Sequence, residues 1–482
     1  MRNMISKNRF DPALALIFIP IIATHIMTLF NDFHTDDWQI LALLHDGFGW
    51  RDFLSMENLS NFRPFTNIVI FIRSFLFDSI PAFWYLLNIA LHLLVTALLY
   101  YFTAKHFNRN VAIFAALFFG IYFQHYEGIL WTYGIVRLLA AINLLCTLMF
   151  YFNYRQNGNK RDLILSCLFY FLAVFTVEEM VIFSGLLFLG LIYHNKNQIG
   201  KNLLEGSLYP LIAILYVLIR AVAIEPDPST EYYFAGLHAF KNYYYYCAWF
   251  LLPDLNHPYF KPFVGRFVPL LGNYAELVNL LSFMIFTAGL ALIFIKGKIK
   301  ERVVIIFLLV SLILPSVLDA KVSPKLVYPP SIAFAIILGL VFNRAYQALQ
   351  NRGKKVIVAI LTAYLLVHAL AINATIYFYH ITQQQVRRVA DNIASLPIDW
   401  DNYDYLILDN VSGRARPGHL LKYRIGFNVR LYLRNEYTED LAIIEDELNR
   451  LRSSGENYIY IDYNNGAPRI LEHHTTRVTR GD

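Results

Sequence analysis

Long apolar runs separated by short polar breaks dominate the first 380 residues of the chain. Eleven of these runs are long enough, or nearly so, to cross the ~30 Å hydrocarbon core of a bilayer. They fall at residues 12–30, 82–102, 111–126, 129–152, 163–177, 180–194, 203–223, 274–295, 302–318, 326–343 and 356–379. The pattern predicts a polytopic α-helical membrane protein with its transmembrane part in residues 1–380. No small-residue cleavage site follows the first run, so we expect a retained helix rather than a removable signal peptide.

The composition agrees with this class of protein. Hydrophobic residues make up 57% of the 482 residues and charged residues 16%, whereas a soluble chain averages about 45–50% and 25%. A disordered, collagen-like or disulfide-stapled chain is excluded. The three cysteines lie in apolar runs without metal-like spacing, and neither a GxGxxG nor a P-loop spacing occurs. The net charge of +6 comes from loops rather than from one basic patch, and we expect no nucleic-acid partner.

Basic residues collect in alternate loops. With the N-terminus in the cytoplasm, 18 Lys and Arg residues fall in cytoplasmic segments and seven in the opposite loops. The positive-inside rule therefore favours a cytoplasmic N-terminus. An odd number of spans then places the C-terminus outside. We expect the protein in the cytoplasmic (inner) membrane.

Two outer loops contain apolar segments that we do not expect to cross the membrane. The loop at 31–80 includes the stretch 64–78, which Arg73 and Asp78 interrupt. The loop at 224–273 includes the Tyr-rich and Phe-rich stretch 237–252. A crossing by 237–252 would place the basic turn 296–302 outside. Both stretches are therefore predicted to be amphipathic or re-entrant elements at the outer interface.

The charge density rises sharply near residue 380. In 381–482, 28 of 102 residues are charged, against 48 of the 380 before them. Strands are predicted at 405–408, 427–433 and 458–461, and an apolar stripe over 441–451 predicts a helix. We expect residues 381–482 to form a small extracytoplasmic α/β domain.

Acidic residues gather on the outer side. Asp36 and Asp37 follow the first span directly, and a carboxylate in a confined cleft can take a proton from an attacking hydroxyl. It can also hold a divalent cation such as Mg²⁺ or Mn²⁺, for which Asp36, Asp37 and Glu127 would be the ligands. His125 and Glu127 stand between the third and fourth spans as a spare base, metal ligands or a polar turn. An ordinary solvated loop is the alternative for the aspartates.

Four residues near the outer helix ends are suited to bind a phosphate. Arg63 closes the first outer loop, Arg137 lies early in the fourth span, and Lys325 with Tyr328 begins the tenth. Cations at this level can bind a phosphate oxyanion and stabilise its departure as a leaving group. The alternative is interfacial snorkelling of the cations.

Further polar residues interrupt the apolar runs. His92 lies one turn after Asn88 and is suited to an interhelical hydrogen bond or to donor binding. Glu178 and Glu179 share a tight outer corner where two carboxylates repel. We therefore expect one of them to be protonated or bound to a cation.

The order of these pieces resembles the GT-C glycosyltransferases, most of all the branch of the tetratricopeptide-repeat O-mannosyltransferases and their bacterial relatives. The resemblance covers about residues 1–345. It rests on Asp36-Asp37, Arg63-Pro64, Asn88, His92, Glu127, Arg137-Leu-Leu, Glu179 and Lys325-Leu-Val-Tyr-Pro-Pro-Ser331. Glu178 stands where that branch has lysine and Lys325 where it has arginine. The helical repeats are absent, and the α/β tail takes their place.

The resemblance implies a sugar donor carried on a polyprenyl phosphate and inversion at the anomeric carbon. The acceptor would be a hydroxyl of a protein, a glycan or a lipid on the extracytoplasmic face. The resemblance implies Asp36 as general base with Asp37 in support. It implies phosphate binding by Arg63, Arg137, Lys325 and Tyr328, and supporting roles for His92, His125, Glu127 and Glu179. No cofactor follows from it, and a divalent cation is left open.

Three other classes of protein share some of these features. A transporter or lipid-linked glycan flippase would line a pathway with intramembrane Arg, Glu and His, but the inverted repeats that favour it do not occur in the sequence. A glycan polymerase would place its chemistry in a late outer loop. A non-catalytic scaffold is the last alternative.

Overall fold

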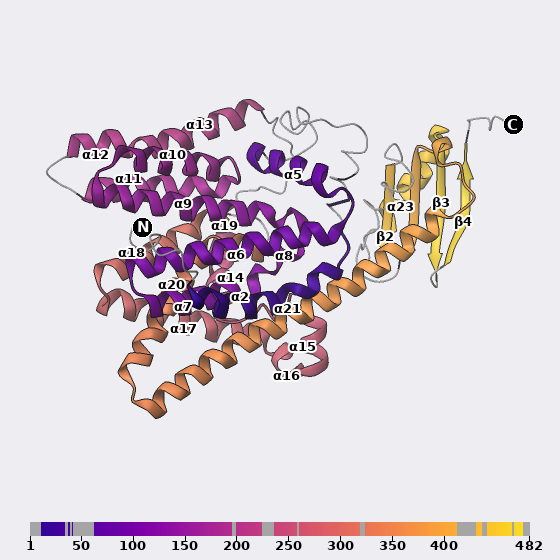
Figure 1. Ribbon diagram of the computed structural model, residues 1–482. Coiled ribbons are helices and arrows are strands. Elements are labelled where there is room, and N and C mark those ends of the chain that lie inside the picture. Colours follow the sequence, from indigo (N-terminus) through magenta and orange to yellow (C-terminus); the bar gives the residue numbers. More distant parts are fainter. Residues whose placement is uncertain are drawn as a thin grey trace. The chain divides into compact units, whose positions relative to one another are not determined.

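The computed structural model describes residues 11–33, 37, 38, 41, 62–194, 199–223, 236–257, 260–318, 323–411, 430–435, 441–464 and 467–475. The chain divides into two compact units. The helical unit comprises residues 1–29, 50–73 and 83–376, and the mixed unit comprises 30–49, 74–82 and 377–482. Both can be followed in Figure 1.

Helices account for almost all of the described chain up to residue 394. Their bounds are α2 Pro12–His25, α5 Pro64–Phe77, α6 Pro81–His106, α7 Arg109–Gly120, α8 Tyr126–Leu130, α9 Ile135–Asn157, α10 Lys160–Val174, α11 Phe183–His194, α12 Ile199–Gly206, α13 Leu208–Ala223, α14 His238–Trp249, α15 Lys261–Phe267, α16 Pro269–Asn273, α17 Ala275–Lys296, α18 Ile299–Ser311, α19 Ile313–Leu318, α20 Pro330–Ala348 and α21 Asn351–Ala394. Short 3₁₀ turns at Glu178–Ile182 (η4) and Pro324–Val327 (η6) join some of them.

The chain is an integral membrane protein. Within the described residues, seven helices are long and apolar enough to cross a membrane, or eight if the pair Arg109–Gly120 and Phe123–Leu130, bent by 57°, forms one broken span. All eleven predicted stretches contain a helix. Helices α10, α11 and α18, however, have only 15, 12 and 13 residues, which is fewer than the ~20 that cross the hydrocarbon core at 1.5 Å per residue.

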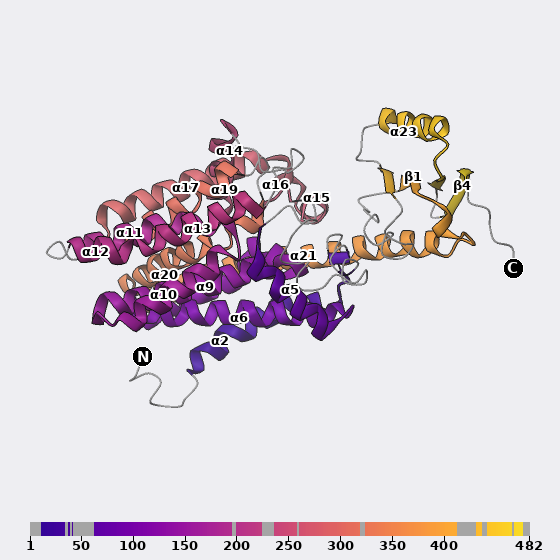
Figure 2. The same cartoon turned by 90° about the horizontal axis from the view of Figure 1, so that it is seen from above.

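The helices of the helical unit pack closely side by side (Figure 2). Helix α9 packs against α10, α7 against α20, and α14 against α17. A Cβ atom on Gly339 of α20 would lie 2.6 Å from the carbonyl oxygen of Val111 on α7. Small residues that let helix backbones approach are a common packing device in membranes, and here they bring the helix that begins at Pro330 against α7.

The two segments predicted to lie at the outer interface are the helices α5 and α14. Helix α14 has 12 residues, or about 18 Å, which is too short to cross the membrane. Its Tyr246, Cys247 and Trp249 are buried in a cluster with Phe286 of α17. The segment is therefore packed into the helical unit through one aromatic face.

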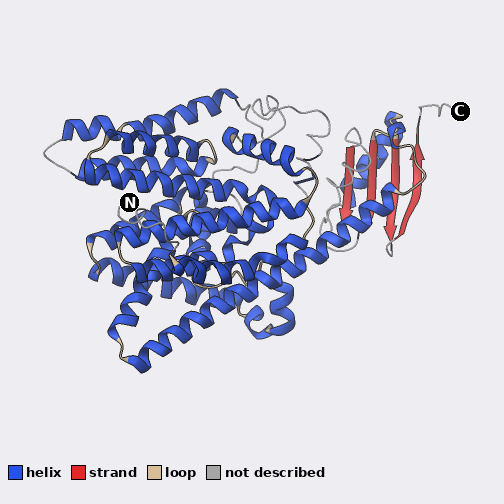
Figure 3. Ribbon diagram, viewed as in Figure 1, coloured by secondary structure: helices blue, strands red, loops and turns tan. Residues whose placement is uncertain are grey.

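The mixed unit contains the strands of the described chain (Figure 3). Strands β1 (Tyr405–Val411), β2 (Arg430–Asn435), β3 (Tyr458–Asn464) and β4 (Ala467–His474) form one sheet in the order β2-β1-β3-β4. Strand β1 is parallel to β2 and β3, and β4 is antiparallel to β3. The predicted small α/β fold is confirmed, with the helix at Leu441–Ser454 (α23).

Each face of this sheet is covered by a helix. On one face, Ile407 of β1 packs with Leu451 of α23. On the other, Asn392 near the end of α21 donates a hydrogen bond to the Tyr463 hydroxyl at 3.0 Å. Strand β4 was not predicted, because its exposed edge position leaves it without the alternation of apolar residues that marks a half-buried strand.

Candidate functional site

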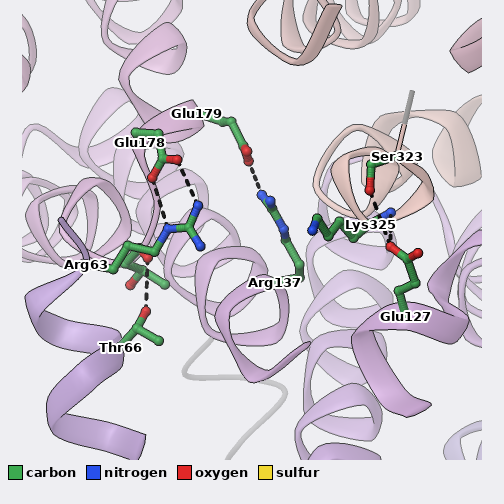
Figure 4. A network of polar contacts seen from close by, with 9 residues as sticks. Arg63, Thr66, Glu127, Arg137, Glu178, Glu179, Ser323 and Lys325 are labelled. Carbon is green, nitrogen blue, oxygen red and sulfur yellow. Dashed lines mark hydrogen bonds and ion pairs between the residues drawn. The ribbon is translucent and has the colours of Figure 1, made fainter. Parts of the chain in front are cut away.

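Two buried ion pairs lie on either side of the 3₁₀ turn η4 (Figure 4). Glu178 accepts hydrogen bonds from Nε of Arg63 at 3.0 Å and from Nη2 at 2.8 Å. Glu179 forms an ion pair with Arg137, which lies in the first turn of α9. All four side chains are more than nine-tenths buried. The adjacent carboxylates therefore bind two different guanidinium groups.

This pairing explains how two adjacent acids can be buried together. Burial raises the pKa of Glu178, but the charge and the two hydrogen bonds of Arg63 outweigh it and hold the pKa of that carboxyl below its ordinary value. We expected one acid of the pair to be protonated or bound to a cation. In the structure, each acid is bound to an arginine.

Glu127 holds the turn that carries Lys325. Its Oε2 atom accepts the main-chain N–H of Lys325 at 3.0 Å and the hydroxyl of Ser323 at 3.5 Å. Its Oε1 atom accepts the hydroxyl of Tyr126 at 2.9 Å. The carboxylate thus binds the backbone of the η6 turn rather than the ammonium group of Lys325.

The ammonium group of Lys325 is directed elsewhere. It lies 4.8 Å from the centroid of the Trp131 ring, and the side chain extends toward Arg137 in Figure 4. Within the described part of the chain, no carboxylate forms an ion pair with Lys325. In this view the side chain of Lys325 points toward Arg137, and of these two cations only Arg137 has a carboxylate partner among the described residues. An anion with several oxygens, such as a phosphate, fits such a pair.

Arg63 has a different environment from Arg137. Two nitrogens of its guanidinium bind Glu178, and the adjoining turn of α5 is bonded to the same loop. The N–H of Phe65 donates to the carbonyl of Phe175 at 3.2 Å, and the Thr66 hydroxyl donates to the carbonyl of Thr176 at 2.9 Å. Arg63 thus fastens the start of α5 to η4, and Phe65 and Thr66 bind the loop before η4.

His92, His125 and Tyr328 form a buried polar cluster. Nε2 of His92 lies 3.0 Å from the carbonyl oxygen of Gly120, so it carries the hydrogen, and Nδ1 accepts the hydroxyl of Tyr328 at 2.6 Å. Nε2 of His125 lies 2.7 Å from the Ser331 hydroxyl. These bonds tie α6, the break after α7 and the start of α20 together. The hydroxyl of Tyr328 is therefore already bonded to His92 of the helical unit.

Of the two aspartates predicted to be catalytic, the structure describes only Asp37. Asp36 lies outside the described residues. Asp37 is fully buried in the mixed unit, beside the buried Trp38. No group of three or more His, Cys, Asp or Glu residues that could hold a metal ion occurs within the described ranges.

Sequence reasoning missed some polar groups near the site. The Tyr126 hydroxyl, which binds Glu127, also forms a short hydrogen bond with Nε2 of His257. Nothing in the sequence around His257 marks it. Arg73 was treated only as an interruption, yet it is buried and donates to the Thr132 carbonyl at 2.9 Å. An arginine within an apolar run was a usable signal for a buried role.

The comparisons with known proteins concern the fold. No protein-family model and no curated protein sequence matches the chain. Among solved structures, ArnT from Cupriavidus metallidurans bound to undecaprenyl phosphate is similar at 12% identity over 93% of this chain and 92% of that one, with a TM-score of 0.52. The Archaeoglobus fulgidus oligosaccharyltransferase in complex with Zn and sulfate is similar at 14% identity over 87% and 62%, with a TM-score of 0.50. The chain therefore shares its fold with these two structures, in agreement with the fold that the resemblance to the GT-C glycosyltransferases implied.

Proposed function

We propose that the protein is a membrane glycosyltransferase that moves a sugar from a polyprenyl-phosphate donor to an acceptor hydroxyl on the extracytoplasmic face. The observation that carries the proposal is that Lys325 of the η6 turn points toward Arg137 at the start of α9, without a carboxylate partner of its own among the described residues. The similar ArnT structure contains undecaprenyl phosphate, which supports a lipid phosphate as the ligand. In this proposal the N-terminus is cytoplasmic and the α/β domain is extracytoplasmic.

The cations suit the change of charge in the reaction. A sugar joined to a polyprenyl phosphate through a phosphodiester carries one negative charge on the phosphate. When the bond from the anomeric carbon to the phosphate oxygen breaks, the leaving monophosphate gains further negative charge, because its second pKa is about 6. Arg137 and Lys325 then bind the departing group more strongly than the donor, and this difference lowers the barrier.

Neighbouring residues hold the two cations in place before the donor arrives. Glu179 pairs with Arg137, and Glu127 fixes the main chain at Lys325. Because these contacts are already formed, little reorganisation accompanies the growth of charge on the phosphate. We assign Arg63 to the support of η4 through Glu178, and Tyr328 to the support of η6 through His92.

The acceptor side of the reaction requires a base. Asp36 would take the proton of the acceptor hydroxyl while that oxygen attacks the anomeric carbon from the face opposite the phosphate, which inverts the configuration. Asp37 would support it. The acceptor hydroxyl belongs to a protein, a glycan or a lipid.

One observation favours a second candidate, a transporter or flippase. Helices α7 and α8 form a broken span bent by 57°, and discontinuous helices are common at transporter sites. The two functions differ in detergent solution. Transport can be observed only between two compartments that a membrane separates. A transferase releases polyprenyl phosphate in detergent solution as well.

The experiment follows from this difference. Protein purified in detergent is incubated with labelled polyprenyl-phosphate sugars and with extracts of candidate acceptors. Release of polyprenyl phosphate together with a labelled acceptor supports the proposal, and Asp36→Asn should abolish it while the protein keeps its thermal stability. Unchanged turnover in Asp36→Asn would remove Asp36 from the mechanism. Mass spectrometry of glycans and glycoproteins from a deletion strain identifies the sugar and acceptor.

A further inference from the structure

Asp32, which follows the first span, is bound to two residues of α21. The main-chain N–H of Asp32 donates to Oε1 of Gln383 at 2.9 Å, and Nε2 of Gln383 donates back to the carbonyl oxygen of Asp32. The carboxylate of Asp32 forms an ion pair with Arg387 at 2.7 Å and accepts the N–H of Phe33 at 2.9 Å. Main chain and side chain of Asp32 are thus both held, across 351 residues of sequence.

Helix geometry makes this contact a well-defined one. Gln383 and Arg387 are four residues apart and therefore lie on one face of α21. Gln383 is buried, so its two hydrogen bonds are shielded from water, whereas the side chain of Arg387 is 50% exposed and that of Asp32 17%. The two hydrogen bonds to the side-chain amide of Gln383 fix the direction of the main chain at Asp32. The ion pair with Arg387 adds a contact that depends on charge.

The chain is held again a few residues later. Asp37 and Trp38 are buried, and the Trp38 ring meets the ring of Phe33 edge to face with centroids 5.3 Å apart. In sequence, Asp36 lies between these two anchored points, four residues after Asp32 and one before Asp37. The described residues that precede and follow Asp36 in the sequence are therefore both held in place.

We infer that Asp32, Gln383 and Arg387 are positioning residues for the loop that carries Asp36. The inference rests on the proposed function, in which Asp36 is the base. The same helix binds the sheet of the α/β domain through Asn392 and Tyr463. The end of α21 thus contacts both Asp32 and the sheet of the α/β domain. None of these three residues touches the donor phosphate in the proposed mechanism.

The test compares two neighbouring arginines. Arg388 is exposed and forms no hydrogen bond or ion pair with any residue that the structure describes, so Arg388→Gln is a matched control for Arg387→Gln. We expect Arg387→Gln to lower kcat roughly tenfold without changing KM for the donor, because misplacement of a reacting group costs up to about 10²-fold. The exchanged pair Asp32→Arg with Arg387→Asp should recover activity relative to either single variant.

A second measurement does not depend on activity. Hydrogen–deuterium exchange of residues 30–41 should be faster in Arg387→Gln than in Arg388→Gln. Equal exchange in the two variants, or equal kcat, would overturn the inference. If exchange differs while the wild-type protein transfers no sugar, the contact of Asp32 with Arg387 holds the segment but the proposed function fails. The failure of the inference and the failure of the proposed function are therefore distinguishable.

Discussion

The carboxylate of Glu127 accepts the main-chain N–H of Lys325 at 3.0 Å, and the ammonium group of the same lysine lies instead over Trp131. An acid that binds the backbone holds the turn without neutralising the side chain. Glu127 therefore leaves the charge of Lys325 unpaired by its own carboxylate, and the position of Lys325 is set by a residue 198 positions earlier in the sequence.

Replacing Glu127 by Gln should weaken donor binding. The amide retains one oxygen acceptor, and its NH₂ group would meet the N–H of Lys325 or the hydroxyl of Tyr126. We expect KM for the donor to rise about tenfold, in line with about 1.5 kcal/mol for a hydrogen bond to a charged group. Ser323→Ala is the control, because its 3.5 Å contact with Glu127 is at the limit of a hydrogen bond. Equal effects of the two substitutions would contradict the role of Glu127.

Arg63→Met should destabilise the protein rather than alter its affinity for the donor. The substitution leaves Glu178 buried without its partner, which costs about 3–5 kcal/mol, and thermal unfolding in detergent should report it. Adding Glu178→Gln should restore most of the lost stability. If Arg63→Met instead kept its melting temperature and lost donor affinity, Arg63 would be a phosphate ligand, as the resemblance implied.

Gly134→Ala should disturb the site from the turn between Glu127 and Arg137. A Cβ atom at Gly134 would lie 2.5 Å from the carbonyl oxygens of both Glu127 and Gly128. We expect a loss of about 1–3 kcal/mol in stability, together with weaker donor binding. Gly185→Ala is the control, since nothing lies within 4 Å of its Cβ position. A Gly134→Ala protein that behaves like this control would show that the turn tolerates displacement.

Asp254→Asn should stabilise the protein at neutral pH. Burial raises the pKa of Asp254 to about 6, the N–H of Asn256 opposes the rise and Glu276 adds to it. Between the ordinary pKa of 3.8 and about 6, the folded protein holds a proton that the unfolded chain has lost, so stability falls as the pH rises through this window. Above it, the ionised carboxylate costs roughly 3 kcal/mol.

The variant removes that cost, because asparagine keeps an oxygen for the N–H of Asn256, which Asp254 accepts at 3.0 Å. Thermal unfolding should therefore show Asp254→Asn above the wild-type protein at pH 7.5 and close to it at pH 4. A gain of the same size at both values would mean that the effect is not electrostatic.

The helices and the class of fold could be predicted from the sequence because they depend on local apolar composition. The places of Arg137 and Lys325 near the outer helix ends were predicted from their positions in the apolar runs, but the pairing of Arg137 with Glu179 was not. Spacing in the sequence does not show which acidic residue pairs with which basic residue, because the partners lie far apart. Arg63 and Glu178, for example, are separated by 115 residues. Pairing over such distances is decided by helix packing.

Other parts of the site left no sequence signal at all. Glu127 binds a main-chain N–H, and every residue except proline offers one, so the identity of Lys325 does not reveal the contact. Asp32 and Gln383 bind each other through the main chain of Asp32 and the side-chain amide of Gln383. Arg73 was the exception, since a charge in an apolar run is conspicuous. The position of Asp36 stays a prediction from the resemblance.

The most direct test of the proposed mechanism is donor turnover by Arg137→Gln and Lys325→Gln. Purified wild-type protein, these two variants and Arg388→Gln are compared with a labelled polyprenyl-phosphate sugar, and release of polyprenyl phosphate is followed. We predict that wild-type protein and Arg388→Gln release it, and that each of the two site variants loses at least about tenfold in kcat/KM, as expected for a lost contact of about 1.4 kcal/mol or more with the developing charge. Wild-type rates in both site variants would contradict a phosphate site between Arg137 and Lys325.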